Sequence, residues 1–294
     1  MSANQKLPIV LAHGIARFDI LLEILRSKSL LRENELEDRF QYFKGIKSHL
    51  ESNGFEVFHP NQDFAGSVDL RAEQLKARVN EILSGRGVDK VHIIAHSMGG
   101  LDARRMIVDK DMAEHVASLT TIGTPHLGTI LADHVINHGG FFLIEGLRRV
   151  INLDGFADLT ITACEQFNRR AEDQEASNNV SYQTYASAES FHLVFAPLVP
   201  SWIFIRDHEG KNDGLVPFRS QHWKNELVAQ DGRRKTIAQK EFPIPADHLN
   251  QVGWWDPQEA ANPAIGLLSL IKPAQIEEYE SQIKNVYLGI AQSL

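Results

Sequence analysis

Residues 91–106 read VHIIAHSMGGLDARRM, a stretch that begins with an apolar strand pattern, turns tightly and continues as a helix-like segment. At the turn, Ala95 and Gly99 flank Ser97 at two residues on either side. Small side chains are needed there because the turn brings the two backbones together, and it projects the serine hydroxyl from the strand end. Ser97 is therefore a candidate nucleophile. The alternative is an ordinary turn between a strand and a helix that carries a serine and no chemistry.

A serine hydroxyl becomes a good nucleophile only when a base removes its proton, and the base is usually a histidine oriented by a carboxylate. Asp213 in the turn 212–217 and His248 in the loop 247–252 are the preferred acid and base. The apolar residues after Asp213 turn back toward the core, which fixes its carboxylate better than a free loop would. A strand is predicted before this turn, over Trp202–Ile205.

Other residues compete for these two roles. Asp207 and Asp231 are alternative acids, and His208 and His222 are alternative bases. Asp-Gly is also a routine turn signal, so the sequence around Asp213 has a structural explanation as well.

The N-terminal run Leu7–Ala12 predicts a further buried strand, which ends at His13-Gly14-Ile15. A backbone N–H after that glycine can point at the oxygen that becomes negatively charged during acyl transfer. The N–H of the residue after the nucleophile is the usual second donor. Ile15 and Met98 are therefore the candidate oxyanion-hole donors. The alternative for His13-Gly14 is an ordinary turn at the end of a strand.

Five motifs follow one another along most of the chain, and together they resemble the bacterial triacylglycerol lipases of the Pseudomonas–Proteus group, within the α/β-hydrolases. They are PIVLAHG at 8–14 with Phe18-Asp19, AHSMGG at 95–100, TIGTPHLG at 121–128, NDGLV at 212–216 and DHLNQV at 247–252. The resemblance implies an α/β-hydrolase fold with a helical cap or lid. It implies Ser97 as nucleophile, Asp213 as acid, His248 as base, and oxyanion donors at Ile15 and Met98. The implied activity is carboxylic-ester hydrolysis, with triacylglycerol as the expected substrate.

The sequence departs from the family pattern at two positions. Ala95 replaces a glycine that is more common there, and Asn250 stands where these lipases usually carry a calcium-binding aspartate. Upstream of the acid motif, residues 187–190 offer only Glu189 as a carboxylate. Calcium favours several hard carboxylate oxygens. We therefore predict no cofactor and keep a structural calcium ion as an open alternative.

Two further functions remain open at this point. A thioesterase or an acyltransferase would use the same triad and acyl-enzyme with a different bond or acceptor. A non-catalytic module of the same fold would bind a partner through the apolar segment 128–155.

Composition narrows the class of protein. The chain has 294 residues and a formal net charge of −8, which argues against nucleic-acid binding as its main activity. The single Cys164 cannot form an internal disulfide, and we expect it to be buried as a small apolar side chain.

The sequence shows neither a signal peptide nor an apolar run of the roughly 20 residues that span a bilayer. The expected location is cytoplasmic, or secreted without a cleavable N-terminal signal.

Apolar runs alternate with amphipathic segments along the chain, which predicts one α/β domain over residues 1–294 with a mostly parallel sheet and helices on both faces. The predicted strands are Pro8–Ala12, Phe55–His59, Val91–Ala95, Leu119–Ile122, Tyr182–Ala186 and Trp202–Ile205. The predicted helices are Phe40–Ser52, Ser67–Leu83, Gly99–Lys110, Thr160–Glu172 and Gln275–Ser293.

The apolar segment 128–155 is interrupted by Gly139-Gly140 and Gly146. It is expected to be a lid that covers an acyl-binding cleft and meets the lipid–water interface when open. The alternative is an ordinary pair of core helices joined by a glycine turn.

Overall fold

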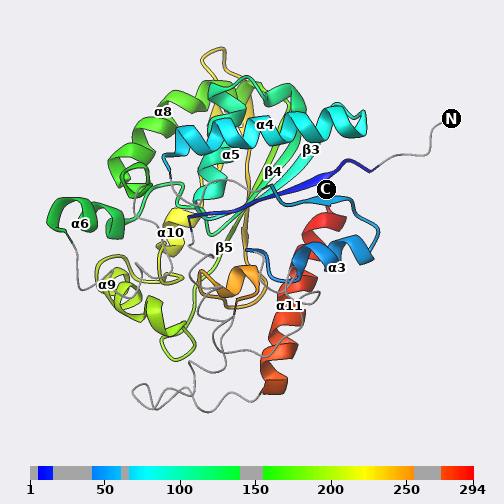
Figure 1. The fold of residues 1–294 in the computed structure, drawn as a ribbon. Coiled ribbons are helices and arrows are strands. Elements are labelled where there is room, and N and C mark those ends of the chain that lie inside the picture. Colours follow the sequence, from blue (N-terminus) through cyan, green and yellow to red (C-terminus); the bar gives the residue numbers. More distant parts are fainter. Residues whose placement is uncertain (1–5, 16–41, 61–65, 140–154, 255–272) are drawn as a thin grey trace.

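The computed structural model describes residues 6–15, 42–60, 66–139, 155–254 and 273–294. A six-stranded sheet with the order β2-β1-β3-β4-β5-β8 forms its centre (Figure 1). Its strands are β1 (Ile9–Ala12), β2 (Val57–Phe58), β3 (Val91–His96), β4 (Val116–Ile122), β5 (Ser181–Ala186) and β8 (Ala238–Glu241). Every pairing between neighbours is parallel. The carboxyl ends of the strands therefore lie along one edge of the sheet, which is where such folds place their sites.

Helices cover both faces of the sheet because the strand side chains alternate between two apolar clusters (Figure 1). In β1, Ile9 and Leu11 belong to one cluster, and Val10 and Ala12 belong to the other. The first cluster includes side chains of α3 (Ile46–Ser52) and α11 (Pro273–Gln292). The second includes side chains of α4 (Val68–Arg86), α5 (Met98–Asp109) and α8 (Ile161–Ser177).

Shorter elements complete the described chain. The remaining helices are α6 (Ile130–His138), α9 (Val199–Glu209) and α10 (Phe218–Gln221), with 3-10 turns at Ala113–His115, Phe156–Leu159, Ala196–Leu198 and Asn250–Val252. A separate antiparallel hairpin pairs β6 (Glu226–Val228) with β7 (Arg234–Thr236). None of the helices in the described part of the chain is long and apolar enough to cross a membrane.

The predicted parallel sheet and the helices on its two faces are confirmed, but the predicted strand Trp202–Ile205 is wrong. These residues lie inside α9, which has a proline in its first turn. Trp202 and Ile205 are buried, whereas Ile203 and Phe204 are half-buried. This is the i, i+3 spacing of a helix face and differs from the alternation of a strand. Four apolar residues in a row are compatible with both, so periodicity over so short a run did not separate them.

Only part of the predicted lid, 128–155, can be described. Its first helix, α6, begins after Thr129, whose hydroxyl accepts a hydrogen bond from the N–H of Leu131. The helix ends at Gly139, which has a φ of 67°. Residues 140–154, with Gly140 and Gly146, lie outside the described residues, so the lid stays a prediction.

A fully buried ion pair joins two of the helices that cover the sheet. Arg104 on α5 contacts Glu175 on α8 through both ends of its guanidinium, with Nε–Oε1 at 2.8 Å and Nη2–Oε2 at 3.0 Å. The guanidinium also lies 3.7 Å from the ring centroid of Trp223. Because both charges are removed from water, each depends on its partner for compensation.

We expect Glu175→Gln to lower the free energy of unfolding by about 3–5 kcal/mol, because it leaves the Arg104 charge buried without a counter-charge. Urea denaturation measures the loss. Glu165→Gln is the matched control, since Glu165 pairs with Arg169 at the surface, where ion pairs contribute about 0–1 kcal/mol. Equal effects of the two substitutions would contradict the prediction.

Candidate active site

Ser97 occupies the sharp turn between β3 and α5. Its φ of 57° and ψ of −135° are strained for a residue with a side chain. Two hydrogen bonds hold this conformation. The N–H of Ser97 donates to the carbonyl of Ile122 at 2.9 Å, and the Thr124 hydroxyl donates to the carbonyl of Ser97 at 2.8 Å. The neighbouring strand β4 and the loop after it therefore fix the serine at the edge of the sheet.

The glycines after Ser97 are required by close packing. A Cβ atom at Gly99 would lie 2.5 Å from the carbonyl oxygen of Ala12, and one at Gly100 would lie 2.2 Å from Oγ1 of Thr124. Ala95, by contrast, is fully buried at the end of β3, opposite Ala12 of β1. The fold thus accommodates the methyl group that replaces the more common glycine at position 95.

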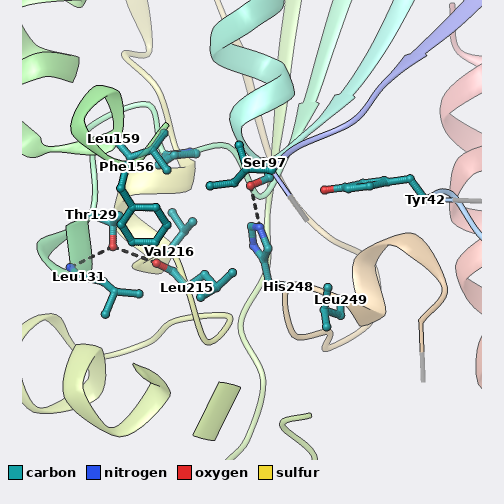
Figure 2. A pocket seen from close by; sticks show the side chains of 12 residues that line it. Tyr42, Ser97, Thr129, Leu131, Phe156, Leu159, Leu215, Val216, His248 and Leu249 are labelled. Atoms are coloured by element: carbon teal, nitrogen blue, oxygen red, sulfur yellow. Dashed lines mark hydrogen bonds between the residues drawn. The ribbon is translucent and has the colours of Figure 1, made fainter. Parts of the chain in front are cut away.

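The structure brings Ser97, His248 and Asp213 together in one line. Nε2 of His248 lies 2.7 Å from Oγ of Ser97 (Figure 2). On the other side of the ring, Nδ1 of His248 lies 2.7 Å from Oδ2 of Asp213. A carboxylate only accepts, so Nδ1–H donates to Asp213 and Nε2 is left to accept the serine hydroxyl hydrogen. This is the geometry that a serine nucleophile and its base require.

Four hydrogen bonds hold the Asp213 carboxylate, which is fully buried. Oδ1 accepts from the N–H groups of Leu215 at 3.0 Å and Val216 at 2.8 Å. Oδ2 accepts from His248 and from the side-chain amide of Gln251, the latter at 3.0 Å. The turn after Asp213 therefore fixes the carboxylate through its own backbone.

Asp213 does not follow a strand directly, in contrast to the prediction. The chain leaves β5, passes through α9 and returns, and the N–H of Glu189 then donates to the carbonyl of Asn212 at 3.2 Å. This contact brings the acid turn back to the carboxyl end of β5. In space, Asp213 lies where a residue directly after β5 would lie. Along the chain, more than twenty residues separate it from the end of β5.

The loop that carries His248 is fixed by the carboxylate beside it. Oδ1 of Asp247 accepts from the N–H groups of Leu249 at 2.9 Å and Asn250 at 2.8 Å, and Oδ2 accepts from Phe195 at 2.6 Å. Burial raises the pKa of Asp247 to about 7, and these three donors oppose the rise. The backbone N–H of His248 also donates to the carbonyl of Asp213 at 2.8 Å. Sequence reasoning did not assign Asp247 a role.

The competing acids and bases make other contacts. Asp207 and Asp231 form exposed ion pairs with Arg206 and Arg233. His208 contacts the carbonyl of Phe204, and His222 contacts the side chain of Gln239.

The predicted oxyanion residues lie beside Ser97. A Cβ atom at Gly14 would lie 2.7 Å from Cβ of Ser97 and 3.0 Å from its Oγ, so the loop 13–15 passes directly against the nucleophile. Met98 is the first residue of α5, and N–H groups in the first helical turn have no acceptor within their helix. Ile15 lines the same pocket as Ser97. Ile15 and Met98 therefore stay the candidate oxyanion-hole donors.

A buried arginine that the sequence analysis did not identify holds this loop. Nη2 of Arg71, on α4, lies 2.5 Å from the carbonyl oxygen of His13 and 3.4 Å from that of Gly14, while Nε lies 2.8 Å from Oδ2 of Asp102. A trans peptide points its C=O and N–H in opposite directions, so carbonyls bound to Arg71 turn the following N–H groups away from it. The sequence did contain a sign that Arg71 is buried, because it lies at helical spacing between Val68 and Leu75 on the apolar face of its helix.

Ser97 and His248 open into an apolar pocket (Figure 2). Its other lining residues are Ile15, Tyr42, Pro125, Thr129, Leu131, Phe156, Leu159, Leu215, Val216 and Leu249. The Thr129 hydroxyl donates to the carbonyl of Leu215 at 2.9 Å, which leaves its methyl group among the apolar side chains. Such a pocket suits a hydrocarbon chain beside the reacting carbonyl.

The thiol of Cys164 is not part of this site. It is buried, lies 3.4 Å from the carbonyl oxygen of Pro125, and burial raises its pKa to about 12. A thiol that stays protonated is a poor nucleophile, as expected for a small buried side chain.

The expected calcium position carries an amide in place of a carboxylate. Nδ2 of Asn250 donates to the carbonyl of Trp254 at 2.9 Å, and its Oδ1 is buried with no hydrogen-bond partner among the described residues. Oε1 of Glu189 accepts hydrogen bonds from the N–H and the hydroxyl of Ser190. In the described ranges, no three His, Cys, Asp or Glu side chains gather as metal ligands. Calcium usually takes six to eight oxygen ligands with several carboxylates among them.

Comparisons with known proteins agree with the geometry. Residues 64–142 match the family model described as a PGAP1-like alpha/beta domain. Triacylglycerol lipase 2 of Saccharomyces cerevisiae is 31% identical over 291 residues, which cover 85% of this chain and 81% of that protein. A triacylglycerol lipase of Pseudarthrobacter phenanthrenivorans is 37% identical over 136 residues, which cover 45% of this chain and 37% of that protein.

Solved structures of ester hydrolases share the fold. A metagenomic carboxyl esterase superposes with a TM-score of 0.63 at 16% identity, over 99% of this chain and 77% of that one. The mature lipase BlEst2 of Bacillus licheniformis superposes with a TM-score of 0.59 at 20% identity, over 85% of this chain and 87% of that one.

We expect Arg71→Lys to lower kcat for a p-nitrophenyl ester by about tenfold or more, because a lysine keeps the charge beside Asp102 but cannot hold the loop carbonyls with a planar fork. Steady-state kinetics measure the change. Arg78→Lys, at an exposed position of the same helix, is the control and should be neutral. Unchanged kcat in Arg71→Lys would show that the loop is held by other contacts.

Proposed function

Because the chain belongs to the triacylglycerol lipases, a family of α/β-hydrolases, we propose that it cleaves acylglycerol esters through an acyl-enzyme on Ser97. The chain is a serine ester hydrolase. The observation that carries the proposal is the line of hydrogen bonds from Ser97 through His248 to Asp213, which starts at the floor of an apolar pocket.

In this mechanism Nε2 of His248 takes the hydroxyl proton of Ser97 as Oγ attacks the ester carbonyl carbon. The carbonyl oxygen gains a negative charge, which the N–H groups of Ile15 and Met98 stabilise. When the C–O bond breaks, the protonated imidazole gives its proton to the leaving alcohol. Water then attacks the acyl-enzyme in the same way and releases the fatty acid. Asp213 holds the imidazole and stabilises its protonated form throughout.

The pocket lining supports a lipid ester as substrate. Leu131, Phe156, Leu159 and Val216 present apolar groups beside Ser97, with no charged side chain among the lining residues. We also propose that the segment 128–155 contacts lipid, since Thr129, Leu131 and the 3-10 turn 156–159 beyond its end contribute to the wall of the pocket.

Two finer assignments belong to the same proposal. The partial matches to bacterial lipases support a relation to the Pseudomonas–Proteus group, whereas the yeast relative matches over a greater length. We also propose that hydrolysis requires no metal ion. The neutral amide of Asn250 supports this, because calcium favours carboxylate ligands.

We expect Ser97→Ala to fold normally and to lose ester hydrolysis by about ten-thousandfold or more, because the nucleophile is gone while the pocket remains. A fluorophosphonate probe should label the wild type and fail to label this variant. Ser52→Ala, on the exposed end of α3, is the control. Normal turnover in Ser97→Ala would refute the nucleophile assignment.

We further expect kcat/KM to rise from acetyl to medium-chain esters, by up to about fourfold for each added methylene that the pocket buries. Rates measured with a series of p-nitrophenyl esters give this slope, and Leu131→Asp should flatten it. A preference for acetyl esters would exclude the lipase assignment and would leave a short-chain esterase.

A further inference from the structure

Behind the triad lies a second row of buried polar side chains that the mechanism does not use. Nε2 of Gln251 lies 3.0 Å from Oδ2 of Asp213, and Oε1 of Gln251 lies 3.0 Å from Nε2 of His96. Nδ1 of His96 in turn lies 2.6 Å from the hydroxyl of Tyr42. Gln251 and His96 are fully buried, and Tyr42 is 3% exposed.

We propose that Tyr42, His96 and Gln251 form a hydrogen-bond chain with one fixed direction, which keeps an N–H donor on Asp213 and ties the triad to the oxyanion loop. The three act as positioning residues, and the inference rests on the proposed function, in which Asp213 orients His248.

The direction of the chain follows from Asp213. A carboxylate accepts only, so Gln251 must present its NH2 group to Asp213 and its oxygen to His96. His96 must then carry its proton on Nε2, which leaves Nδ1 as an acceptor. The hydroxyl of Tyr42 must therefore donate to Nδ1. Each group thus determines the orientation of the next.

The far end of the chain reaches the oxyanion loop. The hydroxyl oxygen of Tyr42 accepts a hydrogen bond from the backbone N–H of Gly14. A Cβ atom at Gly14 would lie 2.8 Å from this oxygen, so the loop and the tyrosine are in close contact. The Gly14 N–H thus faces Tyr42, and the next N–H along the loop, that of Ile15, is the proposed donor to the substrate oxygen.

The surroundings keep every member of the chain neutral. Burial lowers the pKa of His96 well below its ordinary value, and the neighbouring His248, with ring centroids 4.6 Å apart, lowers it further. Hydrogen bonds to Gln251 and to the backbone of His248 oppose this drop without reversing it. Burial also raises the pKa of Tyr42, with the charges of Arg71, Asp102 and Asp213 nearby. No proton leaves the chain in the neutral range, so its direction is stable.

Packing leaves little freedom for another arrangement of Gln251. Gly123 has a φ of 60°, and a Cβ atom there would lie 2.1 Å from Oε1 of Gln251. The backbone of Gln251 is held at both sides, because its N–H donates to the carbonyl of Asp247 at 3.0 Å and its carbonyl accepts from Tyr287 at 3.0 Å. The glutamine can still rotate its amide by a half-turn, which would place Oε1 against the Asp213 carboxylate. The bond from His96 opposes that rotation.

A double-mutant cycle tests the chain. We expect Tyr42→Phe and Gln251→Met each to lower kcat/KM for a p-nitrophenyl ester by about tenfold, since each removes a hydrogen bond on which the Asp213 contact depends. Each substitution breaks the same hydrogen-bond chain. The double variant should therefore lose no more kcat/KM than the more impaired of the two single variants. Losses that multiply to about a hundredfold would show independent roles and overturn the proposal.

The matched control is Tyr182→Phe. Tyr182 is also buried, and its hydroxyl accepts from Asn178 at 2.9 Å, away from the triad. We expect it to leave kcat/KM unchanged, which separates the loss of a buried hydroxyl from the loss of the chain.

A second measurement does not depend on any variant folding. Nitrogen-15 NMR of histidine-labelled wild-type protein should show His96 neutral, with its proton on Nε2, between about pH 5 and pH 8. A proton on Nδ1 would overturn the proposal. If the fluorophosphonate probe fails to label Ser97, the proposed function fails, whereas the NMR result still decides the direction of the chain.

Discussion

The whole site depends on the strained backbone of Ser97. Its positive φ turns the chain sharply between β3 and α5, and this puts the hydroxyl at the edge of the sheet and the N–H of Met98 beside it. The turn is held by bonds to β4 and the loop after it, and it is possible only because glycines follow it at positions 99 and 100. One local constraint thereby positions the candidate nucleophile and one candidate oxyanion donor together.

Around this turn, hydrogen bonds hold several buried charged and polar side chains. Arg71 holds the carbonyls of the oxyanion loop, and Asp213 accepts four hydrogen bonds. Such groups are costly to bury without partners, and with partners they fix orientation more strictly than apolar packing does. Polar contacts thus position the candidate catalytic groups, whereas the apolar pocket is the proposed binding site of the acyl chain.

The polar groups around Ser97 and the walls of the apolar pocket come from different parts of the chain, and this has a functional consequence. The candidate catalytic groups come from strand ends and from loops tied to them, and they are nearly inaccessible to solvent. The pocket walls come largely from α6, the 3-10 turn at 156–159 and the loop after Asp213. Substitutions in the walls can therefore alter substrate preference without moving the chemistry, which is the arrangement expected of a fold that serves many ester hydrolases.

The sequence by itself determined the strands and the turn at Ser97, because each is encoded by residues that are neighbours in the chain. Short apolar runs located β1, β3, β4 and β5, and the small residues around Ser97 identified the turn. Short runs were ambiguous, and Trp202–Ile205 was predicted as a strand because four residues fit either period. The roles of Arg71, Gln251, His96 and Tyr42 were decided only by tertiary structure. Their partners lie between 31 and 155 residues away, and no local pattern encodes a hydrogen bond across such a separation.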